Sequence, residues 1–452
     1  MKIRLFNLFI LFVTIAFTSC SKDFLEPTVT TQRDAATSIN TVDDLKGLII
    51  GAYDRMNAAS YYGRDFIVYG EVRSDNAYSS GNTGRFVAQG QFTLTANNAN
   101  VSDTWAQIYR VISNTNLVIT STVANNDSKE VKYVKGQAHA IRALAYMDLL
   151  RLYGQQYSGG NLGVPIVTQF RDENQFPERA TVTEVWNQIG QDLQKAVELM
   201  DPTLDKTTPT EVNSWTAYAL QSRYYLYIKD YQKAAAAAKK VIDSGKYSMT
   251  TVANHVSSWA AVTNANSIFQ LAFTPTDNLG FNSLFFIYQQ TSYGDIEVTD
   301  DLYNLYTATD VRRSLYTKTA VRTRMTGKYS KIDYTDHIKV IRYDEVILNY
   351  AEALVHLNSP DALTYLNMIP VNRGATPYTE ATLANVYLER RKELAMEGHR
   401  FFDLMRWEMA VPKVDSRQSF TATIPFGSPV LAFPIPQNEL NANPSIIQNP
   451  GY

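Results

Sequence analysis

Residues 388–407 have the sequence LERRKELAMEGHRFFDLMRW, and their spacing predicts two short helices that carry buried charges. Glutamates recur every four residues from Glu389, so they share one face of the first helix. Gly398 is expected to end that helix, because glycine adopts the left-handed conformation without steric cost. In the second helix, charged residues lie on one side and aromatic and apolar residues on the other. The charged residues of the two predicted helices are Glu389, Arg390, Glu393, Glu397, Arg400, Asp403 and Arg406.

These charges allow two interpretations. Arginines and carboxylates that face each other across two helices favour a buried ion-pair network, which fixes how the last helices pack. The alternative is a pair of carboxylates that act as general acid and base. The sequence favours the network, because no nucleophile motif, zinc-binding motif or phosphate-binding loop accompanies these residues.

The composition is that of a globular protein of 452 residues with a formal net charge of -2. This balance does not indicate a polyanionic partner such as a nucleic acid. The 29 tyrosines suit carbohydrate or peptide recognition, because the ring combines an apolar face with a polar tip, but they suit helix packing equally well. The single cysteine excludes an intrachain disulfide.

The N-terminus explains that cysteine. Lys2 and Arg4 precede an apolar run at 5–17, which is too short to span a bilayer and is typical of a secretory signal peptide. We predict that residues 1–19 are removed and that Cys20, which follows two small residues, becomes lipidated. Acyl chains would then anchor the mature chain to a membrane.

Residues 20–452 are predicted to form a mainly α-helical body. Apolar residues recur at three- and four-residue spacing, and pairs of short helices at 214–247 and 342–369 are similar to degenerate tetratricopeptide repeats. Two stretches, about 59–100 and 251–324, lack this period and are rich in aromatic and turn-forming residues.

The two irregular stretches are the predicted ligand-binding region, because binding residues are commonly carried by loops on a rigid scaffold. A protein that binds sugars stacks their apolar faces on aromatic rings and orients them with polar side chains. The candidates are Asp75, Asn76, Tyr78, Arg85, Phe86, Tyr288, Tyr293 and Asp295. Any one of them could instead serve loop packing. The proline-rich tail at 420–452 is expected to wrap around the body in an extended form.

Several segments together resemble the SusD/RagB family, the nutrient-binding outer-membrane lipoproteins of Bacteroidetes. Besides 388–407, the matching segments are KDFLEP after Cys20, WAQIYRVISNTNLVI, KGQAHAIRALAYMDLLRLYG, IRYDEVILNYAEAL and FPIPQNELNANPSIIQNPGY. The resemblance covers the mature chain. It implies a scaffold of tetratricopeptide-like helix pairs with a less regular ligand-binding region, a lipid-anchored position on the cell exterior, and a SusC-like TonB-dependent transporter as partner.

The leading functional hypothesis is therefore capture of a glycan without chemistry. The alternatives are capture of a peptide, a glycoside hydrolase that uses carboxylates such as Glu71, Asp75 or Asp295, and a scaffold that only docks partners. No cofactor is expected, and the five scattered histidines do not have the spacing of metal ligands.

Overall fold

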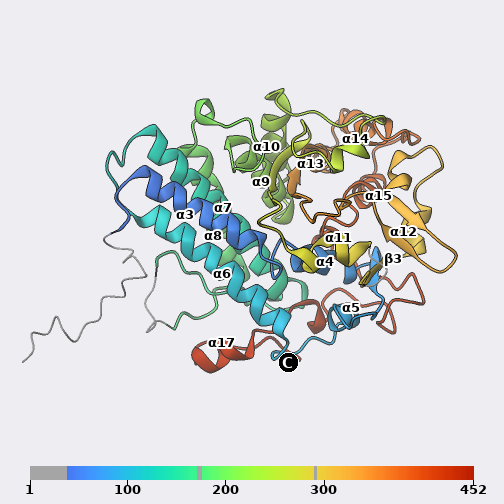
Figure 1. Ribbon diagram of the computed structural model, residues 1–452, viewed down its shortest axis with the longest axis horizontal. Coiled ribbons are helices and arrows are strands. Elements are labelled where there is room, and N and C mark those ends of the chain that lie inside the picture. Colours follow the sequence, from blue (N-terminus) through green and yellow to red (C-terminus); the bar gives the residue numbers. More distant parts are fainter. Residues whose placement is uncertain (1–37, 171–175, 290–292) are drawn as a thin grey trace, which may run out of the picture. The chain divides into compact units, whose positions relative to one another are not determined.

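The computed structural model describes residues 38–170, 176–289 and 293–452. Residues 41–452 form one structural unit that is built mainly from helices, as the sequence predicts. Neighbouring helices pack against one another in the order α3, α6, α7, α8, α9, α10, α13, α14 and α15 (Figure 1). Their bounds are α3 Val42–Asn57, α6 Ala99–Thr120, α7 Lys129–Tyr153, α8 Val182–Leu199, α9 Ser214–Tyr227, α10 Tyr231–Asp243, α13 Tyr343–His356, α14 Ala362–Val371 and α15 Leu383–Glu393.

Local sequence accounts for where several helices begin. A capping box at Thr181 and Glu184 opens α8: each side chain bonds to the backbone N–H of the other residue. Thr41 and Asp44 do the same at α3. Close packing between helices is also encoded, because Gly136 lies where an added Cβ would come 2.6 Å from Met200.

Two small antiparallel sheets interrupt the helical scaffold. One has the strand order β1-β3-β5-β4, and the other pairs β2 with β6. The strands are β1 Ala77–Ser79, β2 Ser267–Leu271, β3 Ile296–Val298, β4 Tyr316–Lys318, β5 Thr323–Met325 and β6 Ile338–Arg342. Strands β1 and β3 belong to the first and second irregular stretches, and Tyr78 lies opposite Glu297 in their register. The sheet therefore joins the two stretches that the sequence singled out.

The irregular stretches contain short helices as well, namely α4 Asp65–Val72, α5 Val87–Gln91, α11 Leu284–Tyr288 and α12 Asp300–Asn304. The prediction that 59–100 lacks helical structure is wrong for α4 and for the five-residue α5. All eight residues of α4 are buried, so the helix lacks the polar face that would give a helical period in the sequence.

The stretch 388–407 differs from its prediction in one respect. The helix α15 ends at Glu393, and Met396 and Gly398 both adopt positive φ angles before α16 Arg400–Arg406 begins. Glu397 therefore lies in the turn between the two helices and not on the face of α15. Gly398 has the predicted left-handed conformation, with φ +86°.

The tail contacts the helical body at several points. The backbone N–H of Phe433 donates to the carbonyl of Leu152, and that of Gln437 donates to Ala96. A short helix, α17 Gln437–Ala442, interrupts the extended path. The predicted signal peptide 1–19 and Cys20 lie outside the described residues. No helix within 38–170, 176–289 and 293–452 combines the length and the apolar character that a membrane span requires.

Candidate ligand-binding site

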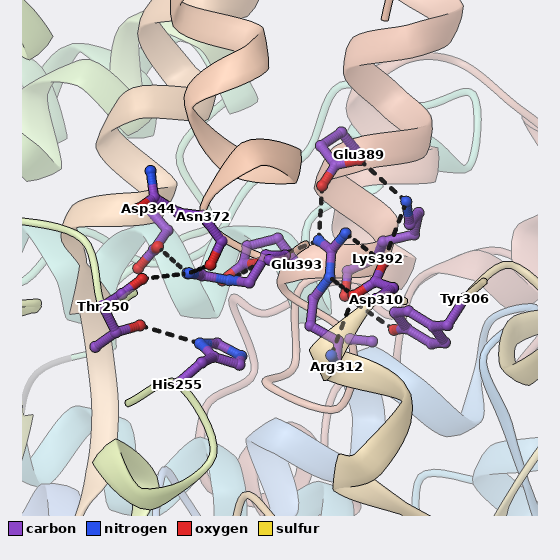
Figure 2. A network of polar contacts seen from close by, with 12 residues as sticks. Thr250, His255, Tyr306, Asp310, Arg312, Asp344, Asn372, Glu389, Lys392 and Glu393 are labelled. Carbon is purple, nitrogen blue, oxygen red and sulfur yellow. Dashed lines mark hydrogen bonds and ion pairs between the residues drawn. The ribbon is translucent and has the colours of Figure 1, made fainter. Parts of the chain in front are cut away.

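A buried network of ion pairs forms the foundation of the site, and Glu393 lies at its centre (Figure 2). The Glu393 carboxylate accepts hydrogen bonds from Arg312 at 3.1 Å, from Arg342 at 3.2 Å and from Arg373 at 3.0 Å. Burial alone would raise the pKa of Glu393, but the three guanidinium groups outweigh it and hold that pKa well below its usual value.

The other charged residues of 388–407 are also buried and paired. Glu389 pairs with Arg312, Glu397 with Arg342 and Lys328, Arg390 with Asp403, Arg400 with Asp75, and Arg406 with Asp403 and Glu352. Nearby arginines lower the pKa of Glu397 and Asp403 despite burial. A general acid needs the opposite shift, so these carboxylates suit charge pairing and not proton transfer.

The network extends to Asp75 and Asn76, which precede β1. Arg400 donates to both oxygens of Asp75, at 2.7 and 2.8 Å, and Arg391 donates to Asn76 Oδ1 at 2.9 Å. Asn76 in turn donates to Glu71, which accepts a bond from the Gly398 backbone. These side chains are fully buried. They anchor the first irregular stretch to 388–407, and they do not present a face to a ligand as the sequence analysis expected.

Three other candidates also lie inside the protein. Tyr78 donates to Glu297 at 2.7 Å, and the guanidinium of Arg417 lies over its ring. Tyr288 is fully buried in α11, and Phe86 packs its ring against Tyr69. We revise the role of Tyr78 and Tyr288 from ligand contact to support of the site, because their rings are enclosed by other side chains. Phe86 is buried as well but borders a cavity.

Of the remaining candidates, Arg85 and Tyr293 are partly exposed and Asp295 is buried. Asp295 Oδ1 accepts bonds from the backbone N–H and the hydroxyl of Thr83, at 3.1 and 2.5 Å, and so holds the loop after β1 against the second stretch. The guanidinium of Arg85 lies 4.6 Å from the centre of the Tyr293 ring. Tyr293 stacks on Phe281, with ring centres 6.0 Å apart and planes inclined by 15°.

Phe281 is 59% exposed, which is unusual for a phenylalanine in an aromatic cluster. We call Phe281 and Tyr293 the aromatic shelf. Near it lies a cavity of about 330 Å³, which we call the loop cavity. It is lined by Arg64, Thr83, Gly84, Arg85, Phe86, Ala88, Gln89, Asn98 and Asn100. Arg64 ties the cavity to the second stretch, because it donates to Asn282, the residue after Phe281.

The candidate site described here lies in the two stretches that the sequence singled out, but it includes five residues that the sequence did not indicate: Phe281, Arg64, Gln89, Asn98 and Asn100. Phe281 follows Gly280 in a turn-forming segment, and that was the available signal. This signal does not distinguish Phe281, which is exposed, from Phe285 and Phe286, which lie a few residues later and are buried.

Comparisons with known proteins agree with this architecture. Residues 23–226 match a family described as starch-binding and associating with the outer membrane, and residues 205–452 match the SusD family. A SusD-like protein of Formosa agariphila is 26% identical, with 91% of this chain and 93% of that protein aligned.

Solved structures are similar over most of the chain. A Bacteroides vulgatus protein described as a candidate sugar-binding protein is 30% identical, with a TM-score of 0.85 over 92% of this chain and 100% of that one. A SusD superfamily protein of Bacteroides thetaiotaomicron is 29% identical, with a TM-score of 0.82 over 91% of this chain and 100% of that one.

Proposed function

Because this chain belongs to the SusD family, we propose that it captures a glycan at the cell surface and passes it, chemically unchanged, to a SusC-like TonB-dependent transporter. The observation that carries the proposal is the exposed aromatic shelf beside a polar cavity, both formed where the two irregular stretches meet.

The chemistry of the two parts is complementary to a sugar. The C–H faces of a pyranose ring are apolar and stack on Phe281 and Tyr293, while hydroxyl groups exchange hydrogen bonds with polar side chains of the loop cavity. Phe281 is the exposed ring of the shelf, and Tyr293, which stacks on Phe281 and is covered by Arg85, holds it in place. The shelf therefore loses little conformational freedom on binding.

Hydrolysis is less well supported than capture. A glycosidase needs two carboxylates that flank the bond to be cleaved, about 5 to 9.5 Å apart. Glu71 and Asp75 are buried and accept hydrogen bonds from other side chains of the protein. Asp295 is also buried, and one of its oxygens accepts a hydrogen bond from Thr83. These three carboxylates, which the sequence offered for catalysis, hold the loops in place.

We further propose that Cys20 carries the lipid anchor and that residues 1–19 are its signal peptide. This places the protein on the outer membrane, facing the cell exterior, within reach of the transporter. Mass spectrometry of the N-terminal peptide from the membrane fraction tests the anchor, and a Cys20→Ala variant is expected to leave that fraction. A variant that stays membrane-bound and a cysteine without acyl chains would refute it.

The test of function is isothermal titration of residues 21–452 against plant and host polysaccharides, their oligosaccharides, and peptides, with analysis of each ligand afterwards. We expect saturable binding of one glycan class and recovery of the ligand intact. Binding of peptides alone would assign the protein to the peptide-binding alternative. Shortened glycan products would show an enzyme, and binding of none of these ligands would favour a docking scaffold.

A further inference from the structure

The side chains that line the loop cavity have an unequal balance of charge. Two of the lining residues described, Arg64 and Arg85, carry guanidinium groups, and three, Gln89, Asn98 and Asn100, carry amides; no carboxylate is among them. Hydrogen-bond donors therefore outnumber acceptors around the cavity. A cavity of about 330 Å³ has room for one sugar substituent together with water.

Two of these donors lack an acceptor within the described part of the chain. They are Nη1 of Arg85 and Nε2 of Gln89, and both atoms are buried. Gln89 is only 2% exposed, so bulk water does not satisfy its amide. The great majority of buried donors in proteins have a hydrogen-bond partner, so two unsatisfied donors beside one cavity are available to a group that binds there.

The carboxylates nearest to the two arginines lie behind them. Asp65 is buried and accepts bonds from Arg64 Nε at 2.6 Å and from Asn100 at 2.9 Å. Asp295 is buried and bound by Thr83, and its other oxygen lies 3.8 Å from Arg85 Nη1, which is longer than a hydrogen bond. The two aspartates are thus ion-paired with the guanidinium groups and orient them. Asp295 Oδ2 and Arg85 Nη1 are too far apart to hydrogen-bond, and neither has another partner in the described part of the chain, so Arg85 Nη1 can still donate to a ligand.

From this arrangement we propose that the loop cavity binds the acidic group of a charged glycan, the carboxylate of a uronic acid or a sulfate ester. The inference rests on the proposed function, because the sugar ring that bears the acid is the one that stacks on the aromatic shelf. An anionic oxygen pair accepts bonds from Arg85 and Gln89 together, and charge-assisted bonds of this kind are about twice as strong as neutral ones. A neutral hydroxyl satisfies fewer of these donors.

Matched pairs of ligands test the charge directly. Oligogalacturonate and its methyl ester share one backbone and differ in the acid, and sulfated carrageenan oligosaccharides and their desulfated form make the same comparison for sulfate. We expect the acidic member of at least one pair to bind about tenfold or more tightly than its neutral partner, and its affinity to fall with added salt. The pair whose two members differ in affinity identifies the acidic group that the cavity binds, a carboxylate or a sulfate.

Substitutions link the preference to the cavity. Arg85→Gln and the isosteric Gln89→Glu are expected to reduce binding of the acidic member by about tenfold and to bring it to the level of the neutral one. Phe176→Ala, at an aromatic residue that is 51% exposed and does not line the loop cavity, is the control and should change neither affinity. Thermal unfolding of each variant shows whether it is folded.

The outcomes separate this inference from the proposed function. Equal affinity for both members of each pair, or an acid preference that persists in Arg85→Gln and Gln89→Glu, would overturn the inference and leave glycan capture standing. Binding of neutral glycans only would do the same. If no glycan of either kind binds, the proposed function and the inference both fail.

Discussion

Arg400 and Asp75, which are 325 positions apart in the sequence, form two buried hydrogen bonds. Nε and Nη2 of Arg400 donate to the two carboxylate oxygens of Asp75, at 2.7 and 2.8 Å. The pair joins α16 to the segment that leads into β1. Through β1 and its partner β3, the charged stretch 388–407 therefore helps to determine where the two irregular stretches lie.

Breaking this pair should destabilise the whole protein. Asp75→Asn leaves the buried Arg400 guanidinium without its main counter-charge, and we expect a loss of about 3 kcal/mol in the free energy of unfolding. Urea unfolding followed by circular dichroism measures it. The control is Asp43→Asn, which removes an exposed i,i+3 pair with Lys46 and should cost less than about 1 kcal/mol. Equal losses for the two variants would contradict the anchoring role.

Gly70 should not tolerate any larger residue. An added Cβ would lie 2.1 Å from the carbonyl oxygen of Gly398, so the backbones of α4 and the turn before α16 touch at this point. We expect Gly70→Ala to cost about 3 kcal/mol, the upper part of the range for overpacked cores. Gly47→Ala is the matched control, since its Cβ would meet no atom within 4 Å and alanine favours a helix. Thermal unfolding that is the same for both variants would argue against the close contact.

Stability should fall in mildly acidic solution because the partly buried His337 is held in its neutral form. Burial first, and then the charges of Lys331 and Lys339, lower the pKa of His337 from 6.5 to about 4. The unfolded chain takes up this proton near pH 6.5, so the contribution to stability is complete above that pH and is lost as the pH falls toward 4.

His337→Gln removes that proton and isolates its effect. Gln can still accept the hydrogen bond that Gln270 donates to the His337 ring. We expect the urea midpoint of the natural protein to fall more between pH 7.5 and pH 5 than that of His337→Gln. Parallel falls would show that other groups cause the pH dependence.

The aromatic shelf should contribute to binding but little to folding. Phe281→Ala removes an exposed ring, so we expect about a tenfold loss of affinity for the captured glycan with little change in the temperature of unfolding. Tyr293→Ala should weaken binding similarly. Titration of these variants beside Phe176→Ala checks the prediction. If Phe176→Ala weakens binding as much as Phe281→Ala does, the shelf is not the binding surface.

The sequence by itself determined the family and the mainly helical fold, and it singled out the two stretches in which we place the candidate site. Capping residues such as Thr181 and Glu184 act over a few positions, so their effect is readable from local spacing. The arrangement of charged and apolar residues in 388–407 likewise predicted that the charges would be paired. Periodicity missed α4, which is buried on every side, and helices of five residues such as α5 and α12, which are too short to show a period.

Tertiary structure alone decided which residue pairs with which, and which side chains reach the surface. Glu389 meets Arg312, and Asp75 meets Arg400, at sequence separations for which local spacing carries no information. Asp75 and Tyr288 have the residue types of a sugar site but are buried, whereas Phe281 has the type of a core residue but is exposed. Whether a side chain is exposed depends on which other segments pack over it. In this site that packing is set by tertiary structure, because β1 pairs with β3 and brings the two stretches together.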